Sequence, residues 1–578
     1  MSESRGRDLN LSNLDITIGQ AIRKHTHVRR FYNALKNPGE VQRAMLKRII
    51  ARNVETRFGD DHDFASIDSY ESYRRRVPAM DYEYFRPYIE RSTRGEVRQL
   101  TVENPFMYAT TSGTTAKPKF VPITPEHLRD YTHAFQIHNY HLIESFEKAA
   151  SGRFLIIVSN DEEGRVESGL PYGAVSGMLN RKQPAIIRRH FAMPFEICKI
   201  KDVDRKYYMM LRTALVENVT AILGCNPSSL LLLADQLREH GEALIEDLGR
   251  GTINQAYLPG GELDRAFDYC LKPAPERARE LERILRMDGQ LLPRRVWPEL
   301  SVISCWKGGP MSFYLERLPE FYGAIPVRDF GYMASEGRGS IPISDGGAGG
   351  VLAVTSHFFE FVAEDDIDSE NPRFLLADEL RRGGRYYIFF TTSGGLYRYN
   401  INDLVEVVDY LDNTPIIEFR RKGLGVSSIT GEKVTEEQIL AAVRSSSAEL
   451  DGDGVAHFTA EVRLGYPPYY VCYAEFGNLG HELEEAVSCR FEDEFDRSLR
   501  EQNPEYEDKR ASKRLERPRL HLLPRGTYTR LRQQRVSEGA PEAQVKIPLL
   551  TSHDVFKKRL EALDPDLVSD LVPEPVNI

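Results

Sequence analysis

The chain has 578 residues and a formal net charge of −10, and this acidic balance excludes the basic surplus that is typical of nucleic-acid-binding proteins. Hydrophobic residues make up 41% and aromatic residues 10%, which is a globular and not a disordered composition. Because one hydrophobic core rarely grows beyond about 300 residues, the length predicts a large domain with at least one smaller domain.

The six cysteines are scattered, at positions 198, 225, 270, 305, 472 and 489, and none forms a C-x-x-C pair. Structural zinc and thioredoxin-type chemistry are therefore not indicated. No apolar run approaches the roughly 20 residues that span a bilayer, and the first residues lack the apolar stretch of a secretory signal. We expect a cytoplasmic protein with no membrane span and no nucleic-acid partner; the sequence leaves the oligomeric state open.

The first hundred residues have the apolar spacing of helices, and a helix is predicted over residues 41–54. From about residue 150 the pattern changes to short apolar or β-branched runs, each followed by a turn rich in glycine, serine, proline or asparagine. These runs cover residues 154–158, 219–223, 300–304 and 325–329, with a predicted helix over 228–239. Such repetition predicts an α/β core with parallel strands, whose ligands bind at the carboxyl ends of the strands.

Later runs lie closer together, at residues 351–354, 386–391 and 404–408, and predict an antiparallel or barrel-like subregion. The basic, glycine-bearing stretch at 420–423 is interpreted as a linker. Beyond it, predicted helices at 436–443 and 483–499 accompany predicted strands at 458–464 and 470–476. The chain is therefore expected to have a large N-terminal α/β domain at residues 1–420 and a small C-terminal α+β domain at residues 421–578.

A hydroxyl-rich segment, YATTSGTTAKPK at residues 108–119, is the most informative stretch. Glycine allows a close backbone approach, while hydroxyl and backbone N–H groups can donate to phosphate oxygens. The segment is not a Walker A loop, because it lacks the G-x-x-x-x-G-K-[ST] pattern. A second TTSG at residues 391–394 shows that the tetrapeptide alone is equally consistent with a polar surface turn.

Two later segments, GYMASE at 331–336 and LYRYNIND at 396–403, follow the hydroxyl-rich segment in order. Together the three resemble the signature motifs of the adenylate-forming superfamily, and most specifically the auxin- and jasmonate-type acyl acid amido synthetase family. Further landmarks support the narrower resemblance: VWPEL from residue 296, SCWKGG from 304, GEK from 431 and QVKIP from 544. The resemblance covers residues 30–555 approximately. It implies the adenylate-forming-enzyme fold, with a large α/β domain and a small mobile domain.

The resemblance also implies ATP and Mg²⁺ as cofactors and assigns roles to individual residues. The phosphates of ATP would be gripped by Thr111, Ser112, Gly113, Thr114 and Thr115. The adenine or the phosphate edge would be lined by Met333, Ala334 and Ser335. Glu336 would hold Mg²⁺, which binds proteins through one or two carboxylates plus substrate phosphates. Asp403 would accept hydrogen bonds from the ribose hydroxyls, and Arg398 would brace the phosphates or serve the fold.

Two lysines beyond the predicted linker, Lys433 and Lys546, match the family's catalytic lysines that reach the phosphates. A positioned ammonium stabilises the charge that develops when a carboxylate attacks the α-phosphorus. Without the resemblance, each lysine would be interpreted as surface charge. On the helix after the first motif, Phe135 and His138 are assigned to the wall of the acyl-acid pocket, although a lone histidine is more often a structural residue.

Two positions depart from the family pattern: Asn402 and Ala116 replace glycines. Asparagine tolerates the left-handed conformation, so the turn at Asn402 is expected to survive. The chain is therefore predicted to activate a carboxylic acid as an acyl-AMP and to join it to the amine of an amino acid or another amine. Two alternatives remain open: transfer to a thiol such as coenzyme A, and a non-catalytic nucleotide-binding relative. The landmarks at Trp297 and Trp306 favour the amine.

Overall fold

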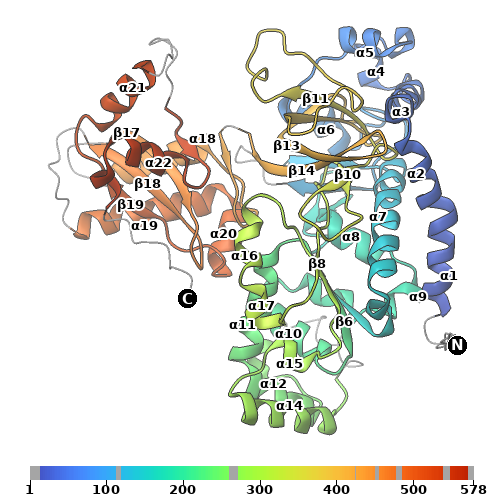
Figure 1. Cartoon of the computed structure of the whole chain (residues 1–578), viewed down its shortest axis with the longest axis vertical. Coiled ribbons are helices and arrows are strands. Elements are labelled where there is room, and N and C mark those ends of the chain that lie inside the picture. The colour runs from blue at the N-terminus through green and yellow to red at the C-terminus, as the bar shows by residue number, and fades with distance from the viewer. Residues whose placement is uncertain are drawn as a thin grey trace, which may run out of the picture. The chain divides into compact units, whose positions relative to one another are not determined.

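The computed structural model describes residues 14–111, 119–258, 271–423, 425–448, 455–476, 485–537 and 547–569. The chain divides into two compact units (Figure 1). The first contains the described residues to Thr111 and from Phe120 to Arg420, and the second contains Lys119 and the described residues from Arg421 onward. Each unit has hydrophobic clusters of its own, so each is described separately.

The first unit begins with six helices. They are α1 (Leu14–Arg23), α2 (Arg29–Leu35), α3 (Pro38–Arg52), α4 (Arg57–Asp61), α5 (Tyr70–Arg76) and α6 (Tyr82–Thr93). The predicted helix at 41–54 is α3, and its apolar side chains Met45, Leu46, Ile49 and Ile50 are all buried, as their helical spacing predicts. A longer helix, α7 (Pro125–Ser145), contacts α1, and the two lie beside each other in Figure 1.

A parallel sheet forms the core of the next part of the first unit. Its strands are β3 (Arg153–Ile157), β6 (Val219–Gly224), β7 (Val302–Ser304) and β8 (Val327–Arg328), in the order β3-β6-β7-β8. Its accompanying helices include α10 (Val203–Ala214), α11 (Pro227–Glu239), α12 (Gly241–Arg250), α14 (Pro275–Asp288), α15 (Pro293–Val296) and α17 (Leu318–Tyr322). The predicted parallel α/β core is confirmed. All four strands point the same way, so the loops after β6, β7 and β8 share one edge.

Two further sheets complete the first unit. The smaller contains β2 (Lys119–Ile123), β1 (Met107–Thr111), β5 (Pro171–Gly173) and β4 (Gly164–Arg165), in this order. The larger has the order β11-β12-β13-β14-β10-β9. Its strands are β9 (Ser340–Ile341), β10 (Gly350–Leu352), β11 (Phe358–Ala363), β12 (Arg385–Thr391), β13 (Tyr399–Leu411) and β14 (Thr414–Lys422). The pairs from β11 to β13 and from β14 to β9 are antiparallel, as the closely spaced runs predict.

Residues 420–423 were predicted to be a linker. The prediction is wrong for residues 420–422, because β14 continues to Lys422. Arg420 donates to Glu406 on β13 (3.0 Å) and to Glu418 on its own strand (2.7 Å). These ion pairs hold the Arg420 side chain against β13 and its own strand. The run of positive charge therefore belongs to the end of a strand, and the division between the two compact units falls within it, between Arg420 and Arg421.

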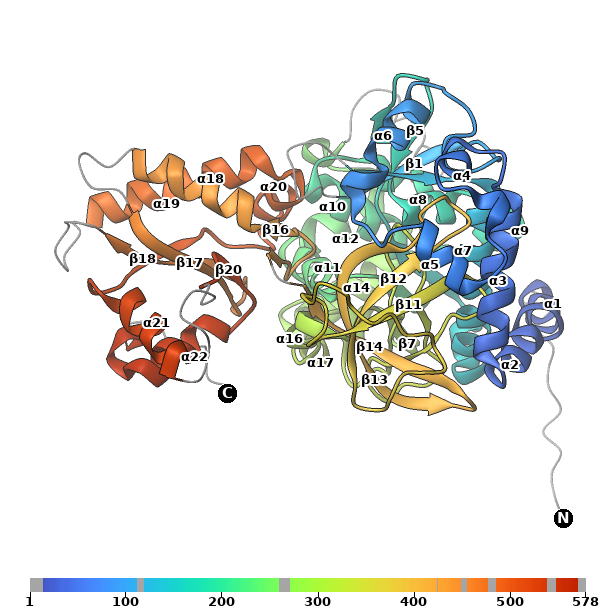
Figure 2. The ribbon, with the colours of Figure 1, turned by 90° about the horizontal axis from the view of Figure 1, so that it is seen from above.

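The second unit is an α+β assembly, as predicted. Its four-stranded sheet has the order β19-β18-β17-β20, made of β17 (Val455–Arg463), β18 (Tyr469–Phe476), β19 (Arg519–Leu522) and β20 (Leu550–Thr551). Figure 2 shows α18 (Glu436–Ala448), α19 (Glu485–Gln502) and α20 (Pro504–Ala511) on one side of β17 and β18, and α21 (Thr527–Ser537) and α22 (Val555–Leu563) on the other. A short pair, β15 (Val426–Ser427) and β16 (Val434–Thr435), precedes α18.

Strand β18 shows why helices cover both faces of this sheet. Tyr470, Cys472 and Ala474 lie in the cluster with α18 and α19, whereas Val471 and Tyr473 lie in the cluster with α21 and α22. Successive side chains of a strand point to opposite faces, so a strand that is apolar at every position requires cover on both sides.

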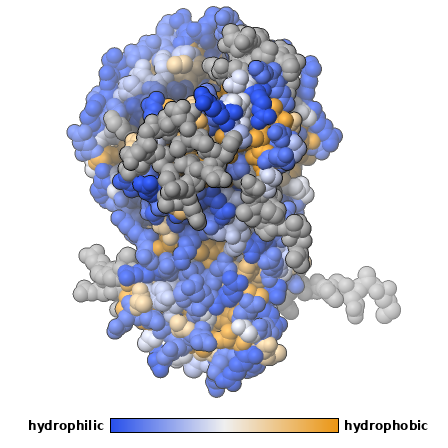
Figure 3. Space-filling model, turned by 90° about the vertical axis from the view of Figure 1, so that its left-hand side faces the viewer, coloured by the Kyte–Doolittle hydropathy of each residue, from blue (hydrophilic) through white to orange (hydrophobic). Residues whose placement is uncertain are grey.

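In the part of the chain that is described, no helix combines the length and apolarity needed to cross a membrane. The face drawn in Figure 3 is mostly hydrophilic, with small apolar patches between the charged side chains. Single apolar residues on a surface are ordinary, because polar groups never cover a whole protein.

Candidate active site

A tight turn after β8 carries the second signature motif. Met333 and Arg338 form an antiparallel bridge, the Ala334 N–H donates to the Gly337 carbonyl (2.9 Å), and the Gly337 N–H donates back to Ala334 (3.3 Å). Gly331 enters the turn with φ of +86°, where a Cβ would come within 2.5 Å of the Ser340 carbonyl oxygen. The predicted residues Met333, Ala334 and Ser335 are half-buried in this turn, and Glu336 is buried.

Two buried carboxylates are each held by a tyrosine that spans the two motifs. Tyr332 in the turn donates to Asp403 Oδ2 on β13 (2.6 Å), and Tyr399 on β13 donates to Glu336 Oε1 in the turn (3.3 Å). Burial, reinforced by the partner carboxylate, raises the pKa of both phenols well above 10. Both tyrosines therefore remain proton donors at neutral pH, and their bonds tie the second motif to the third. The Mg²⁺ role of Glu336 and the ribose role of Asp403 stay predictions.

The glycine replacement at Asn402 behaves as expected. Its φ is +59°, in the left-handed region, and its N–H donates to the Asn400 side chain (2.8 Å). Asparagine occupies this region more readily than most residues because its short polar side chain bonds locally. The turn that delivers Asp403 is therefore preserved without glycine.

Arg398, which is expected either to brace the ATP phosphates or to serve the fold, is bonded within the fold. Its Nε donates to both carboxylate oxygens of Glu360 (3.0 and 2.9 Å), and Nη1 donates to the Val77 carbonyl (2.9 Å). Both members of the ion pair are buried, and the guanidinium lies 4.2 Å from the Phe374 ring centroid. These contacts assign Arg398 to the stability of the sheet, and its contact with ATP stays a prediction.

Helix α7 places Phe135 and His138 beside the same turn. The Arg338 guanidinium lies 4.3 Å from the Phe135 ring centroid, and the His138 ring stacks on Phe330 at 5.5 Å and 23°. Tyr131 on the same helix donates to the Ala334 carbonyl (3.1 Å), which ties α7 to the turn. Burial, with Arg338 and Arg328 nearby, lowers the pKa of His138 well below 6.5, so its imidazole is neutral at physiological pH.

Asp329 joins the turn to the edge of the parallel sheet. It follows β8, and its carboxylate accepts from the backbone N–H groups of Lys307, in the loop after β7, and of Gly331. Burial raises its pKa to about 6. The turn, the carboxyl ends of β7 and β8, and α7 thus meet at one place, where ligands of parallel α/β sheets usually bind.

Several predicted residues lie outside the described residues: Ser112, Gly113, Thr114, Thr115, Ala116 and Lys546. Thr111 is described only as the last residue of β1. Lys433 lies in the second unit with φ of +46°, directly after Glu432. The Glu432 carboxylate accepts from the Ile429 N–H (2.9 Å) and from the Tyr470 hydroxyl (2.6 Å), which fixes the loop before Lys433. The contacts of both lysines with phosphates stay predictions.

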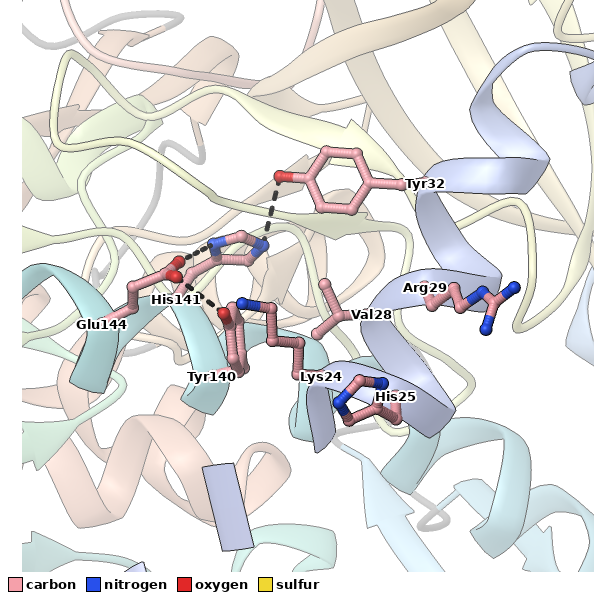
Figure 4. A pocket seen from close by; sticks show the side chains of 8 residues that line it. All are labelled: Lys24, His25, Val28, Arg29, Tyr32, Tyr140, His141 and Glu144. Atoms are coloured by element: carbon pink, nitrogen blue, oxygen red, sulfur yellow. Dashed lines mark hydrogen bonds and ion pairs between the residues drawn. The ribbon is translucent and has the colours of Figure 1, made fainter. Parts of the chain in front are cut away.

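A surface pocket of about 490 Å³ lies elsewhere on α7 and contains none of the predicted residues (Figure 4). It is lined by Lys24, His25, Val28, Arg29, Tyr32, Tyr140, His141 and Glu144. Glu144 accepts a hydrogen bond from Tyr140 (2.6 Å) and pairs with His141 (3.5 Å), so these three polar groups of the pocket bond one another.

Four residues of the site were not singled out from the sequence: Asp329, Tyr332, Arg338 and Tyr399. Tyr332 and Tyr399 lie inside the quoted motifs, so the motifs already pointed to their positions. Tyrosine is also common in hydrophobic cores, and its presence alone does not indicate a site. Arg338 stands between two glycines, which predicts an exposed loop. Its burial comes from contacts with α7 that are remote in sequence.

The chain matches three consecutive domains of one family: the GH3 family N-terminal domain at residues 27–327, the central domain at 350–422 and the C-terminal domain at 437–554. The probable indole-3-acetic acid-amido synthetase GH3.12 of Oryza sativa subsp. japonica is 25% identical, over 90% of this chain and 92% of the relative. Jasmonoyl–L-amino acid synthetase JAR6 of Nicotiana attenuata is 24% identical, over 90% and 92%. The solved AtGH3.15 acyl acid amido synthetase in complex with 2,4-DB has the same fold, with a TM-score of 0.62, 22% identity and coverage of 94% and 96%.

Proposed function

Because this chain belongs to the GH3 family, we propose that it is an ATP-dependent acyl acid amido synthetase. It activates a carboxylic acid as an acyl-AMP and transfers the acyl group to the amine of an amino acid or another amine. Relatives that align with about nine-tenths of the chain are named indole-3-acetic acid-amido and jasmonoyl–L-amino acid synthetases. The observation that carries the proposal is the pairing of the second and third motifs, with Glu336 and Asp403 held by Tyr399 and Tyr332.

Asp403 and Glu336 suit two parts of a nucleotide that carries Mg²⁺, the ribose and the metal ion. Asp403 accepts hydrogen bonds only, which is what the two hydroxyls of a ribose require. Glu336 offers one hard oxygen donor, and the described residues contain no group of three metal-ligating side chains. A single protein carboxylate is enough for Mg²⁺ in a nucleotide site, where phosphates and waters supply the remaining ligands. Bound Mg²⁺ would neutralise charge on the phosphates.

The proposed reaction has two steps. A carboxylate oxygen of the acid attacks the α-phosphorus of ATP, the bond to the β-phosphate oxygen breaks, and pyrophosphate leaves. The amine then attacks the acyl carbon, AMP leaves, and the amine nitrogen loses a proton. Lys546 and Lys433 stabilise the phosphoryl charge of the first step from the second unit, which acts as the mobile domain. A cytoplasmic location belongs to the same proposal.

The test is pyrophosphate release from purified protein with ATP, Mg²⁺ and a panel of carboxylic acids, followed by mass spectrometry of the products. We expect acid-dependent pyrophosphate release, hydroxamate formation on adding hydroxylamine, and an amide when amino acids are supplied. The matched variant Glu336→Gln keeps the side-chain size and is expected to lose most of the release.

Two results would contradict the proposal. Formation of a thioester with coenzyme A but no amide with any amino acid would assign the protein to thiol transfer. Nucleotide binding without pyrophosphate release for every acid would indicate a non-catalytic relative.

A further inference from the structure

Arg338 is a fully buried cation that follows the second motif. Its Nη2 donates to the Phe330 carbonyl (2.5 Å) and its Nε to the Ser340 carbonyl (3.3 Å), and both of these acceptors are neutral. Nη1 has no hydrogen-bond partner among the described residues. A buried charge without a counter-ion is costly, so the arrangement requires an explanation.

Three other buried arginines of the described chain have carboxylate partners. Arg328 pairs with Asp345, Arg398 with Glu360, and Arg463 with Asp554. Asp329 acts on the Arg338 guanidinium only through space, and its carboxylate oxygens accept from the backbone N–H groups of Lys307 and Gly331. Arg338 therefore differs from these three arginines, and it resembles the buried Arg212, whose guanidinium also donates to backbone carbonyls, those of Thr252 and Asp247.

Side chains of α7 and of the turn surround the Arg338 guanidinium. The guanidinium face is covered by the half-buried Phe135 ring, and a carboxylate can bond the edge of a guanidinium in its plane without displacing a ring from its face. His138, one helical turn along α7, is buried with neither ring nitrogen bonded among the described residues. Glu336 lies two residues before Arg338 in the same turn, so an acid held here is close to the metal-binding carboxylate.

We propose that Arg338 is the specificity-determining residue that receives the carboxylate of the acid substrate, through Nη1. This inference rests on the proposed function and names the group that selects for an anionic acid. The described residues provide no carboxylate that pairs with Arg338. The carboxylate of the substrate takes that place, and binding forms a buried ion pair.

The experiment compares Arg338→Met and Arg338→Lys with wild type. The Michaelis constants for acid and for ATP are measured by pyrophosphate release. In parallel, the shift in melting temperature is recorded with phenylacetate and other aryl and alkyl carboxylates, each matched with its neutral carboxamide, without ATP. Arg328→Met is the control, because it removes an equally buried arginine that already has a carboxylate partner.

For Arg338→Met we expect the Michaelis constant for the acid to rise about ten- to hundred-fold, while that for ATP changes less than about twofold. The melting shift caused by acids should disappear, and Arg338→Lys should retain part of it. Arg328→Met should lower the melting temperature without a selective effect on the acid.

The proposal is overturned if Arg338→Met leaves the Michaelis constant for the acid within twofold of wild type, or if wild type binds the carboxamides as well as the acids. The second criterion holds even where the variants do not fold. If wild type releases no pyrophosphate with any acid, the proposed function fails, and the melting shifts measured without ATP still decide the role of Arg338.

Discussion

The hydroxyl of Tyr332 donates to Asp403 Oδ2 at 2.6 Å, and this bond couples the turn of the second motif to the strand of the third. The Tyr332 ring also stacks on Phe419, with ring centroids 6.0 Å apart and planes 6° from parallel. At Gly339 a Cβ would come within 2.3 Å of the Tyr332 ring, so glycine is needed for the ring to lie where it does. The orientation of Asp403, the proposed ribose-binding carboxylate, thus depends on Tyr332, and the Tyr332 ring fits only because residue 339 has no side chain.

Replacing Asp403 should weaken the binding of ATP, because the ribose hydroxyls lose a hydrogen-bond acceptor. We expect Asp403→Ala to cost about 1–3 kcal/mol of ATP binding and to bind ATP and 2′,3′-dideoxy-ATP equally, since the ribose hydroxyls lose their acceptor. Tyr332→Phe keeps the ring and should retain discrimination between the nucleotides with a smaller loss. Isothermal titration calorimetry measures the six affinities, two nucleotides for wild type and for each variant. Equal binding of the two nucleotides by wild type would remove Asp403 from this role.

Replacing Lys546 should affect chemistry more than binding. Loss of one donor to developing charge costs about 3–4 kcal/mol, so Lys546→Ala should form the acyl-AMP about 10²- to 10³-fold more slowly while still binding ATP. Single-turnover kinetics with radiolabelled ATP measures the step. The exposed Lys558 of the same unit supplies the control variant Lys558→Ala. An acyl-AMP rate near wild type in Lys546→Ala would exclude the catalytic role.

The Arg398–Glu360 pair predicts a loss of stability. Removing one member of a buried ion pair leaves an uncompensated charge, so Arg398→Met and Glu360→Gln should each lower the free energy of unfolding by about 3–5 kcal/mol. The double variant Arg398→Met with Glu360→Met should lose less than the sum, because no buried charge remains. Urea denaturation measures all three. ATP affinity of the folded Arg398→Met protein then tests the phosphate contact: a tenfold loss would support it, and unchanged affinity would exclude it.

A buried histidine predicts a loss of stability in acid. Burial lowers the pKa of His127 from 6.5 to about 4, so below pH 6.5 the unfolded chain binds a proton that the folded chain does not. The free energy of unfolding therefore decreases as the pH is lowered from about 6.5 to 4, by about 1.4 kcal/mol per pH unit for this group. The variant His127→Gln should lose about 2 kcal/mol less than wild type between pH 7 and pH 5, measured by urea denaturation at each pH. Parallel pH dependences would show that His127 titrates normally in the fold.

The local order of the chain determined much of the fold. Periodicity of apolar residues was enough to predict α3, the parallel strands and the strands of the second unit, because burial of one face or of both imposes a repeat on the sequence. The ordered motifs identified Glu336 and Asp403, and the conformational tolerance of asparagine predicted the turn at Asn402.

Tertiary structure alone decided which polar residues serve the fold and which remain for a ligand. Arg398 lies inside the third motif and Arg338 follows the second, yet Arg398 bonds the Glu360 carboxylate and Arg338 bonds neutral carbonyls. Likewise, the basic run at Arg420 continues a strand because Glu406 lies opposite it on β13. The free energy of a buried charge depends on the groups around it, and these come from segments remote in sequence, so no local pattern encodes it.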